Sequence, residues 1–387
     1  MKNKSDKLAT KVIHAGEPDP LINGAVSMPI FQTAMYEYSG ESDQENLKYI
    51  RLNNTPNHIA LGLKLAALEN AESALVAGSG MAAISAALLS SLHSGDHLLA
   101  QDCLYGGTRT FITEILPEYG IQYDFIDARR PDTWISKIKP NTKVFYSESM
   151  TNPLLQVADL EAVVEFSKSN GLISMIDNTF ASPVNFRPPE WGFDLSLHSG
   201  TKYLNGHSDI VAGAVIGKSD LVEKAALKLK LLGGALDPHA CFLLHRGLKT
   251  LVLRMKQHNE SGLKAAKFLE NHPCVKNVNY PGLESNDGYS RAVKLFDGFS
   301  GMLSFEPKGG VDAAKKFIQN TTLPIIAPSL GGVETLLTRP ASTSHSGLSA
   351  ADRKKLGISD SLIRVSIGIE DVDDIINDFD QALTKLH

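Results

Sequence analysis

The sequence contains little cysteine: only Cys103, Cys241 and Cys274 occur among 387 residues. None of the three belongs to a Cys-x-x-Cys pair, and a sparse, odd number of cysteines argues against a disulfide framework. The cysteine content therefore predicts a reducing compartment, which we take to be the cytoplasm, and no bound metal is expected.

The sequence also lacks any apolar run approaching the roughly 20 residues that a membrane-spanning helix needs. The N-terminal stretch begins with basic residues but has no apolar segment behind them, so it does not resemble a signal peptide. Positive charge is not in excess, because the formal net charge is −5 and the pI is about 6.2. We therefore expect a soluble protein with neither nucleic acid nor a membrane as its partner.

The composition that remains is that of an ordinary globular protein, with 43% apolar and 21% charged residues. Such values exclude disordered, collagen-like and coiled-coil chains. At roughly 100–200 residues per domain, the length predicts two domains or one large α/β unit.

Short apolar runs alternate with segments of helical spacing from residue 61 onward. Helical spacing is clear at 81–93 and 160–169, for example. The alternation predicts a mostly parallel, doubly wound α/β sheet, in which ligands bind at the carboxyl ends of the strands. The expected strands are 74–77, 97–100, 121–126, 143–146, 172–176, 194–197 and 211–216.

Three regions are expected along the chain. Residues 1–60 have no clean period and many prolines, so they are predicted to form an arm that lies on the body or on a neighbouring subunit. Residues 61–255 would form the large domain. A helical pattern at 243–268 leads into a smaller C-terminal α/β domain, residues 256–387. That domain has its own expected elements, namely strands at 301–305 and 362–366 and a terminal helix at 371–386.

Two polar side chains follow expected strands and could carry chemistry. Asp177 follows the run 172–176; taken alone, it also fits a helix N-cap or an Asx turn. Lys202 lies among small hydroxyl residues after the run 194–197. It is either a surface lysine or a desolvated amine that can form a Schiff base.

Two turns add features of a cofactor site. Gly78-Ser79-Gly80-Met81 joins a strand to a helix, and a helix start offers free N–H groups to an anion, although many such turns bind nothing. Tyr105 stands beside two glycines and could place its ring in a cofactor site; alternatively, it is a tyrosine that only packs within a turn. Together, a phosphate cradle, a flat aromatic ring, a carboxylate and a strand-end lysine match the needs of pyridoxal 5'-phosphate (PLP).

The sequence resembles the Cys/Met-metabolism family of PLP-dependent enzymes over nearly its whole length. The similarity runs from Lys11-Val-Ile-His-Ala-Gly16 to Arg364-Val-Ser-Ile-Gly-Ile-Glu370, and its most specific part is the block SGTKYLNGHSDIVAG at residues 199–213. This resemblance implies the type I, aspartate aminotransferase-like fold, PLP as cofactor, and a trans-sulfuration reaction on a small sulfur amino acid.

The resemblance also implies roles for individual residues. Lys202 resembles the Schiff-base lysine, Asp177 the partner of the pyridine nitrogen, and Tyr105 the tyrosine that stacks on the ring and assists proton transfer. The implied phosphate cup consists of the Gly80 and Met81 amides and the Ser199 and Thr201 hydroxyls. The implied carboxylate site consists of Ser329 and Arg364, with Asn152 near that carboxylate or the cofactor's 3-oxygen.

Tyr49 and Arg51 resemble residues that reach the phosphate of a neighbouring subunit in this family. The resemblance therefore implies a dimer with shared active sites, and a tetramer of two such dimers is the family's usual state.

Several positions depart from the family's γ-lyases. Lys48, Thr110 and Pro328 stand where many of these enzymes carry a glutamate, an arginine and a glutamate that contact the distal end of the substrate. Gly107 stands where methionine γ-lyases usually carry a cysteine, so methionine γ-lyase activity is disfavoured. Cys103, nearby in the sequence, is interpreted as a buried structural thiol.

The resulting prediction is a C–S lyase acting on cystathionine, with β- and γ-elimination both open. The alternatives are a cystathionine γ-synthase, which joins O-acylhomoserine to cysteine, and an O-acylhomoserine sulfhydrylase. A binding protein on an inactive enzyme scaffold is disfavoured, because the whole set of Lys202, Asp177, Tyr105 and Arg364 is intact.

Overall fold

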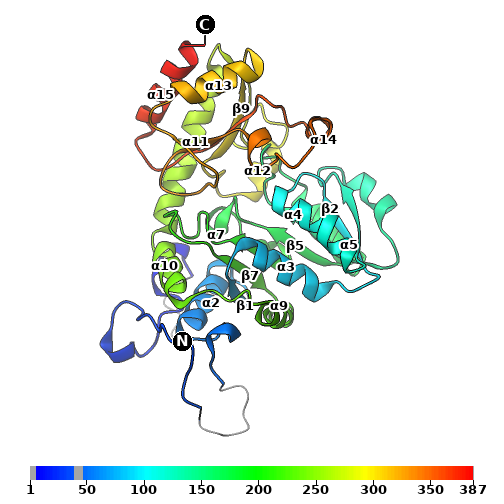
Figure 1. Cartoon of the computed structure of the whole chain (residues 1–387), viewed down its shortest axis with the longest axis vertical. Coiled ribbons are helices and arrows are strands. Elements are labelled where there is room, and N and C mark those ends of the chain that lie inside the picture. The colour runs from blue at the N-terminus through cyan, green and yellow to red at the C-terminus, as the bar shows by residue number, and fades with distance from the viewer. Residues whose placement is uncertain (1–5, 39–46, 387) are drawn as a thin grey trace.

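The computed structural model describes residues 6–38 and 47–386 (Figure 1). Two β-sheets, each with its own helices, lie one beyond the other along the long axis of the molecule. Among the described helices, none is both long enough and apolar enough to cross a membrane.

The larger sheet has seven strands in the order β1-β7-β6-β5-β4-β2-β3. The strands from β2 to β6 run parallel, and β7 is antiparallel to both of its neighbours. This confirms the predicted mostly parallel sheet. The strands are β1 (Ser73–Ala77), β2 (His97–Gln101), β3 (Gln122–Ile126), β4 (Thr142–Glu148), β5 (Ile173–Asp177), β6 (Leu195–Ser199) and β7 (Gly213–Gly217).

The central strands are apolar because helices bury both faces of the sheet. In β2, Leu98 and Ala100 belong to the core on one face, and Leu99 belongs to the core on the other. This is the alternation that a strand imposes on successive side chains. The first face is covered by α3 (Gly80–Ser91) and α9 (Ser219–Leu232), and the second by α2 (Pro56–Glu69), α6 (Leu160–Ser169) and α10 (Pro238–Leu248).

The helix expected at 243–268 is wrong in one respect, because two helices occupy this stretch. Helix α10 ends at Leu248, and α11 (Leu251–Asn271) begins three residues later. Two side chains at the junction donate hydrogen bonds to the carbonyl of Gly247: the Thr250 hydroxyl at 3.1 Å and Arg254 Nη2 at 2.8 Å. Side-chain donors that occupy such a carbonyl favour a break in the helix.

The smaller sheet has five strands in the order β10-β11-β12-β9-β8. Its core packs against α11, α13 (Gly310–Asn320) and α15 (Val372–Thr384). Helix α11 passes without interruption through the domain boundary expected at residue 256, so the division between 61–255 and 256–387 stays a prediction (Figure 1). The strands are β8 (Val275–Asn279), β9 (Met302–Pro307), β10 (Ile325–Ile326), β11 (Leu336–Thr338) and β12 (Ile363–Ser366).

The expected arm at 1–60 has one well-anchored part. Helix α1 (Leu8–His14) inserts Val12 into the large core, and the buried Lys64 Nζ donates to the Val12 carbonyl at 2.9 Å. Of the residues between α1 and α2, the described ones (15–38 and 47–55) are largely irregular, and α2 begins at Pro56, a few residues earlier than expected. The rest of the expected arm, residues 1–5 and 39–46, lies outside the described residues.

Candidate active site

A cavity of about 770 Å³ lies where the carboxyl ends of β4, β5 and β6 face the smaller sheet. All of the predicted site residues line it except Tyr49 and Arg51. The predicted site residues that line the cavity are Gly80, Met81, Tyr105, Asn152, Asp177, Ser199, Thr201, Lys202, Ser329 and Arg364.

Lys202 points into this cavity from the loop after β6. Its Nζ donates to the Ser329 hydroxyl at 2.6 Å. Burial, followed by the positive charge of Arg364, lowers the pKa of Lys202 to about 8. A larger fraction of the amine is therefore neutral near pH 7, as a nucleophile that forms a Schiff base requires.

A buried arginine fixes the loop that carries Lys202. The Arg254 guanidinium donates to the carbonyls of Tyr203 at 2.7 Å and Leu204 at 3.3 Å, and burial lowers its pKa to about 10. The loop can approach so closely because residue 206 is a glycine: a Cβ there would lie 1.9 Å from Arg254 Nη1. Gly206 also has a φ of +75°, which only glycine adopts readily.

Asp177 is the last residue of β5 and accepts the Thr179 N–H at 2.9 Å. Burial raises the pKa of the Asp177 carboxyl, while hydrogen bonds from Thr179 and the nearby His198 ring act in the opposite direction. A buried carboxylate at this position can hold a proton on a ring nitrogen placed against it.

The start of α3 forms a cradle suited to an anion. Ser79 caps the helix by accepting the Ala82 N–H at 3.0 Å, and the earlier amides of Gly80 and Met81 are not used by the helix itself. A Cβ on Gly80 would lie 2.8 Å from Ser199 Cβ, so glycine is needed for the helix start to meet Ser199. Thr201 also lines the cavity, and its hydroxyl accepts the Ala212 N–H at 3.0 Å.

Two glycines set the position of Tyr105. A Cβ on Gly106 would lie 2.3 Å from the Ser344 carbonyl, and a Cβ on Gly107 would lie 2.7 Å from Cε1 of the Tyr105 ring. The Tyr105 N–H donates to Glu148 Oε1 at 2.6 Å. The turn is therefore held at both ends, and the ring lines the cavity while remaining 42% exposed.

Arg364 enters the cavity from β12 of the smaller sheet. Its Nη1 donates to Asn152 Oδ1 at 3.1 Å and its Nη2 to the Ser329 carbonyl at 2.9 Å. In the part of the chain that the structure describes, no carboxylate pairs with this buried guanidinium, and burial lowers its pKa to about 10. Such a group is ready to accept the carboxylate of a ligand.

Ser329 contributes its hydroxyl and its carbonyl to this arrangement. Its hydroxyl accepts from Lys202, and its carbonyl accepts from Arg364. Its φ of +88° is rare for a residue with a side chain. Backbone strain of this kind costs of the order of 1–3 kcal/mol and clusters at functional sites.

Sequence reasoning missed Glu148, which also lines the cavity. Burial and the neighbouring Asp177 charge raise the pKa of this carboxyl well above its usual range. Glu148 ends β4, just as Asp177 ends β5, and the two are register partners in the sheet. Glu148 lies two residues beyond the expected strand 143–146, so a strand expected to end at residue 148 would have marked it in the same way as Asp177.

The positions that depart from the family pattern lie in different places. Pro328 lines the cavity, whereas Lys48 and Thr110 do not. Arg109, next to Thr110, donates to the Asp102 carbonyl at 2.7 Å and lies over the Phe125 ring at 4.3 Å. It is thus engaged outside the cavity.

Cys103 is buried, as expected for a structural thiol, and burial raises its pKa to about 12. Tyr49 and Arg51 lie on the surface, where Arg51 Nη1 donates to the Lys230 carbonyl at 3.3 Å. Their predicted action on a neighbouring subunit stays a prediction.

The cavity residues fit PLP. The cradle at Gly80 suits a phosphate, Asp177 suits the ring nitrogen, and Lys202 has the lowered pKa that an aldehyde-binding amine needs. Arg364 remains available to bind the carboxylate of an amino-acid substrate.

Comparison with known proteins points the same way. The family model described as Cys/Met metabolism PLP-dependent enzyme matches residues 9–384. The cystathionine beta-lyase MetC of Bacillus subtilis (strain 168) is 40% identical over 380 residues, covering 98% of this chain and 97% of that protein. The L-methionine gamma-lyase of Porphyromonas gingivalis is 40% identical over 391 residues, with coverages of 98% and 97%.

Among solved structures, the cystathionine gamma-lyase of Lactobacillus plantarum complexed with L-serine superimposes with a TM-score of 0.93. It is 34% identical, and the match covers 98% of this chain and 99% of that one.

Proposed function

We propose that this chain, which belongs to the Cys/Met metabolism PLP-dependent enzyme family, is a C–S lyase that cleaves cystathionine. With water, the reaction would release a thiol amino acid, a 2-oxo acid and ammonia. The single observation that carries the proposal is the meeting of Lys202, Asp177 and Arg364 in one cavity. These three supply a nucleophilic amine, a ring-nitrogen partner and a carboxylate receptor.

PLP, when bound, supplies an aldehyde that condenses with amines and a ring that withdraws electrons from the substrate Cα. The residues of the chain would do the rest. Arg364 binds the α-carboxylate through two parallel hydrogen bonds and, with Ser329, orients the substrate. The neutral Lys202 amine removes the Cα proton as a general base. Asp177 would keep a proton on the ring nitrogen, and Tyr105 would assist proton transfer.

Cystathionine as substrate is supported by the relatives named for that activity. A second candidate, methionine γ-elimination, is supported by a relative of equal identity. Gly107 argues against this candidate, because the family resemblance implies a cysteine at this position in methionine γ-lyases. A Cβ here would lie 2.7 Å from Cε1 of the Tyr105 ring, so a larger residue would move that ring.

The test is a product assay on purified, PLP-saturated protein. Cystathionine should yield a 2-oxo acid and a free thiol in equal amounts, with pyruvate marking cleavage at Cβ and 2-oxobutanoate marking cleavage at Cγ. Methionine alone, and O-succinylhomoserine plus cysteine, are run in parallel.

The Lys202→Ala variant is the control and should release no 2-oxo acid above background. Formation of cystathionine from O-succinylhomoserine and cysteine, with no 2-oxo acid from cystathionine itself, would replace the lyase proposal with a synthase. Release of a 2-oxo acid from methionine but not from cystathionine would replace the lyase proposal with a methionine γ-lyase.

We also propose that the protein is a cytoplasmic homo-oligomer with shared active sites. Exposed apolar side chains on α9, namely Leu227, Leu231 and Leu232, support an interface between copies of the chain. Arg51→Ala should then loosen PLP in the intact oligomer. Full retention of PLP by this variant would count against sharing of the site.

A further inference from the structure

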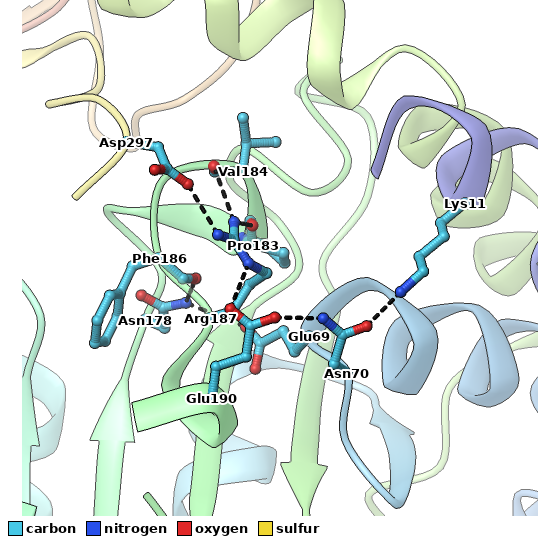
Figure 2. A network of polar contacts seen from close by, with 10 residues as sticks. All are labelled: Lys11, Glu69, Asn70, Asn178, Pro183, Val184, Phe186, Arg187, Glu190 and Asp297. Atoms are coloured by element: carbon cyan, nitrogen blue, oxygen red, sulfur yellow. Dashed lines mark hydrogen bonds and ion pairs between the residues drawn. The ribbon is translucent and has the colours of Figure 1, made fainter. Parts of the chain in front are cut away.

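Glu69, the last residue of α2, lies buried behind the two strand ends of the active site. Its Oε1 accepts from Asn178 Nδ2 at 3.1 Å and lies 2.7 Å from His198 Nε2. Asn178 Nδ2 also donates to the Phe186 carbonyl at 2.8 Å. Figure 2 shows Glu69 and Asn178 meeting between α2 and the segment around Phe186.

The partners of Glu69 alternate along the chain with the residues of the cavity. Asn178 follows Asp177, and His198 precedes Ser199. Successive side chains of a strand point to opposite faces, so the two sets face opposite ways. On the cavity side, Thr179 ties the set together: its N–H donates to Asp177 Oδ1 at 2.9 Å, and its hydroxyl accepts the Ser199 N–H at 2.8 Å.

We propose that Glu69 is a positioning residue for the PLP site, which holds Asn178 and His198 from behind and thereby fixes Asp177 and Ser199 at the ends of β5 and β6. This inference depends on the proposed cofactor site but not on which sulfur amino acid is cleaved.

The burial of these groups makes their contacts hard to replace. Glu69, Asn178 and His198 are each at most 2% exposed. Among the described residues, Glu69 Oε2, Asn178 Oδ1 and His198 Nδ1 have no hydrogen-bond partner, so the bonds at Glu69 Oε1 join the three side chains. A glutamine at position 69 would keep one acceptor oxygen, but it would replace the other oxygen by a buried N–H2 donor group and remove the charge. Both hydrogen bonds at Oε1 would therefore weaken, because a bond to a charged group contributes more than a bond to a neutral one.

His198 also links this group to the chemistry through charge. Burial is the largest influence on the Asp177 carboxyl and raises its pKa, whereas the His198 ring lowers it. A displaced ring would remove that contribution, which would weaken the hold of Asp177 on a protonated ring nitrogen.

The experiment titrates PLP into the apo-protein of wild type, Glu69→Gln and a control, Glu190→Gln. Glu190 belongs to the same network in Figure 2, but it is partly exposed and accepts from Arg187 Nε at 2.9 Å and from Asn70. We expect the dissociation constant of PLP to rise about tenfold in Glu69→Gln. The control should stay within about twofold of wild type, because exposed ion pairs contribute little.

Melting temperatures separate positioning from a purely structural role. If Glu69 positions the site, the rise in melting temperature that PLP produces should be smaller in Glu69→Gln than in wild type and in the control. Equal PLP affinity in a folded Glu69→Gln protein, or an unchanged rise on PLP addition, would overturn the proposal.

If Glu69→Gln does not fold, Asn178→Ser carries the same test, since it removes one donor and leaves the contact with His198. Weaker PLP binding than in the control would support the proposal, and equal binding would overturn it. Because no substrate is present, a wild type that binds PLP but cleaves nothing would refute the proposed function and leave this comparison intact.

Discussion

Capture of PLP by the apo-protein should depend on pH in a way that Lys202 sets. Only the neutral amine attacks an aldehyde, and its pKa of about 8 lies well below the 10.5 of an ordinary lysine. At pH 7 about one Lys202 amine in ten is neutral, against about one in 3,000 for an ordinary lysine. The structure therefore predicts about 300 times more reactive amine at neutral pH.

The assay mixes apo-protein with excess PLP between pH 6 and pH 9.5, stops the reaction with borohydride, and quantifies the modified Lys202 peptide by mass spectrometry. The initial rate should rise about tenfold per pH unit below about pH 8 and then flatten. Nα-acetyl-lysine, whose ε-amine is free, is treated in parallel to correct for the titration of PLP itself, and its rate of modification should keep rising across the whole range.

Arg364→Gln tests the cause of the shift. Arg364 is the second influence on Lys202 after burial, and its positive charge disfavours a second cation. Removing it should raise the pKa of Lys202, so the rate should flatten at a higher pH than in wild type. The reasoning is refuted if wild type shows no flattening below pH 9.5, or if the variant flattens at the same or a lower pH.

Three further changes test separate parts of the site. Arg364→Ala should raise the Michaelis constant for an amino-acid substrate about 10- to 150-fold, since a hydrogen bond to a charged group contributes about 1.5–3 kcal/mol; an unchanged constant in steady-state kinetics would remove Arg364 from the carboxylate site. Gly107→Ala places a Cβ 2.7 Å from Cε1 of Tyr105 and should displace that ring, weakening PLP binding in a fluorescence titration without unfolding the protein; unaltered affinity would contradict a packed ring. Arg254→Lys replaces the guanidinium, which donates to the carbonyls of both Tyr203 and Gly247, by a single ammonium group. Urea unfolding should therefore show a free energy of unfolding lower by about 1–3 kcal/mol, and an unchanged value would contradict a stabilising role for these bonds.

The central strands were predictable because a sheet covered on both faces needs continuous apolar runs. The run 97–100, for example, lies within β2, whose residues are all buried. Asp177 was recognisable because a carboxylate directly after a buried run needs a partner, and Lys202 because it lies among small hydroxyl residues in the turn that follows another such run. Only the resemblance to a family assigned their roles.

The smaller sheet was harder to predict from local pattern. Strand β10 consists of two exposed isoleucines, and β8 has a mixed burial pattern, so neither gives a clear period of two. The end of α10 depends on Arg254, whose contacts are made in three dimensions. The role of Glu69 could not be predicted for the same reason, because its partners Asn178 and His198 lie more than 100 residues away in the sequence.

The active-site residues are divided between the two sheets. Those assigned to PLP project from the larger sheet and its loops, whereas Arg364 stands on β12 of the smaller one. An amino acid held by Lys202 and Arg364 together would act as a removable crosslink between the two halves. A mutation in the core of the smaller half, far from the cavity, should therefore leave a yellow, PLP-loaded protein that binds substrate more weakly. Selection for a different substrate can thus act through residues that do not contact the cofactor.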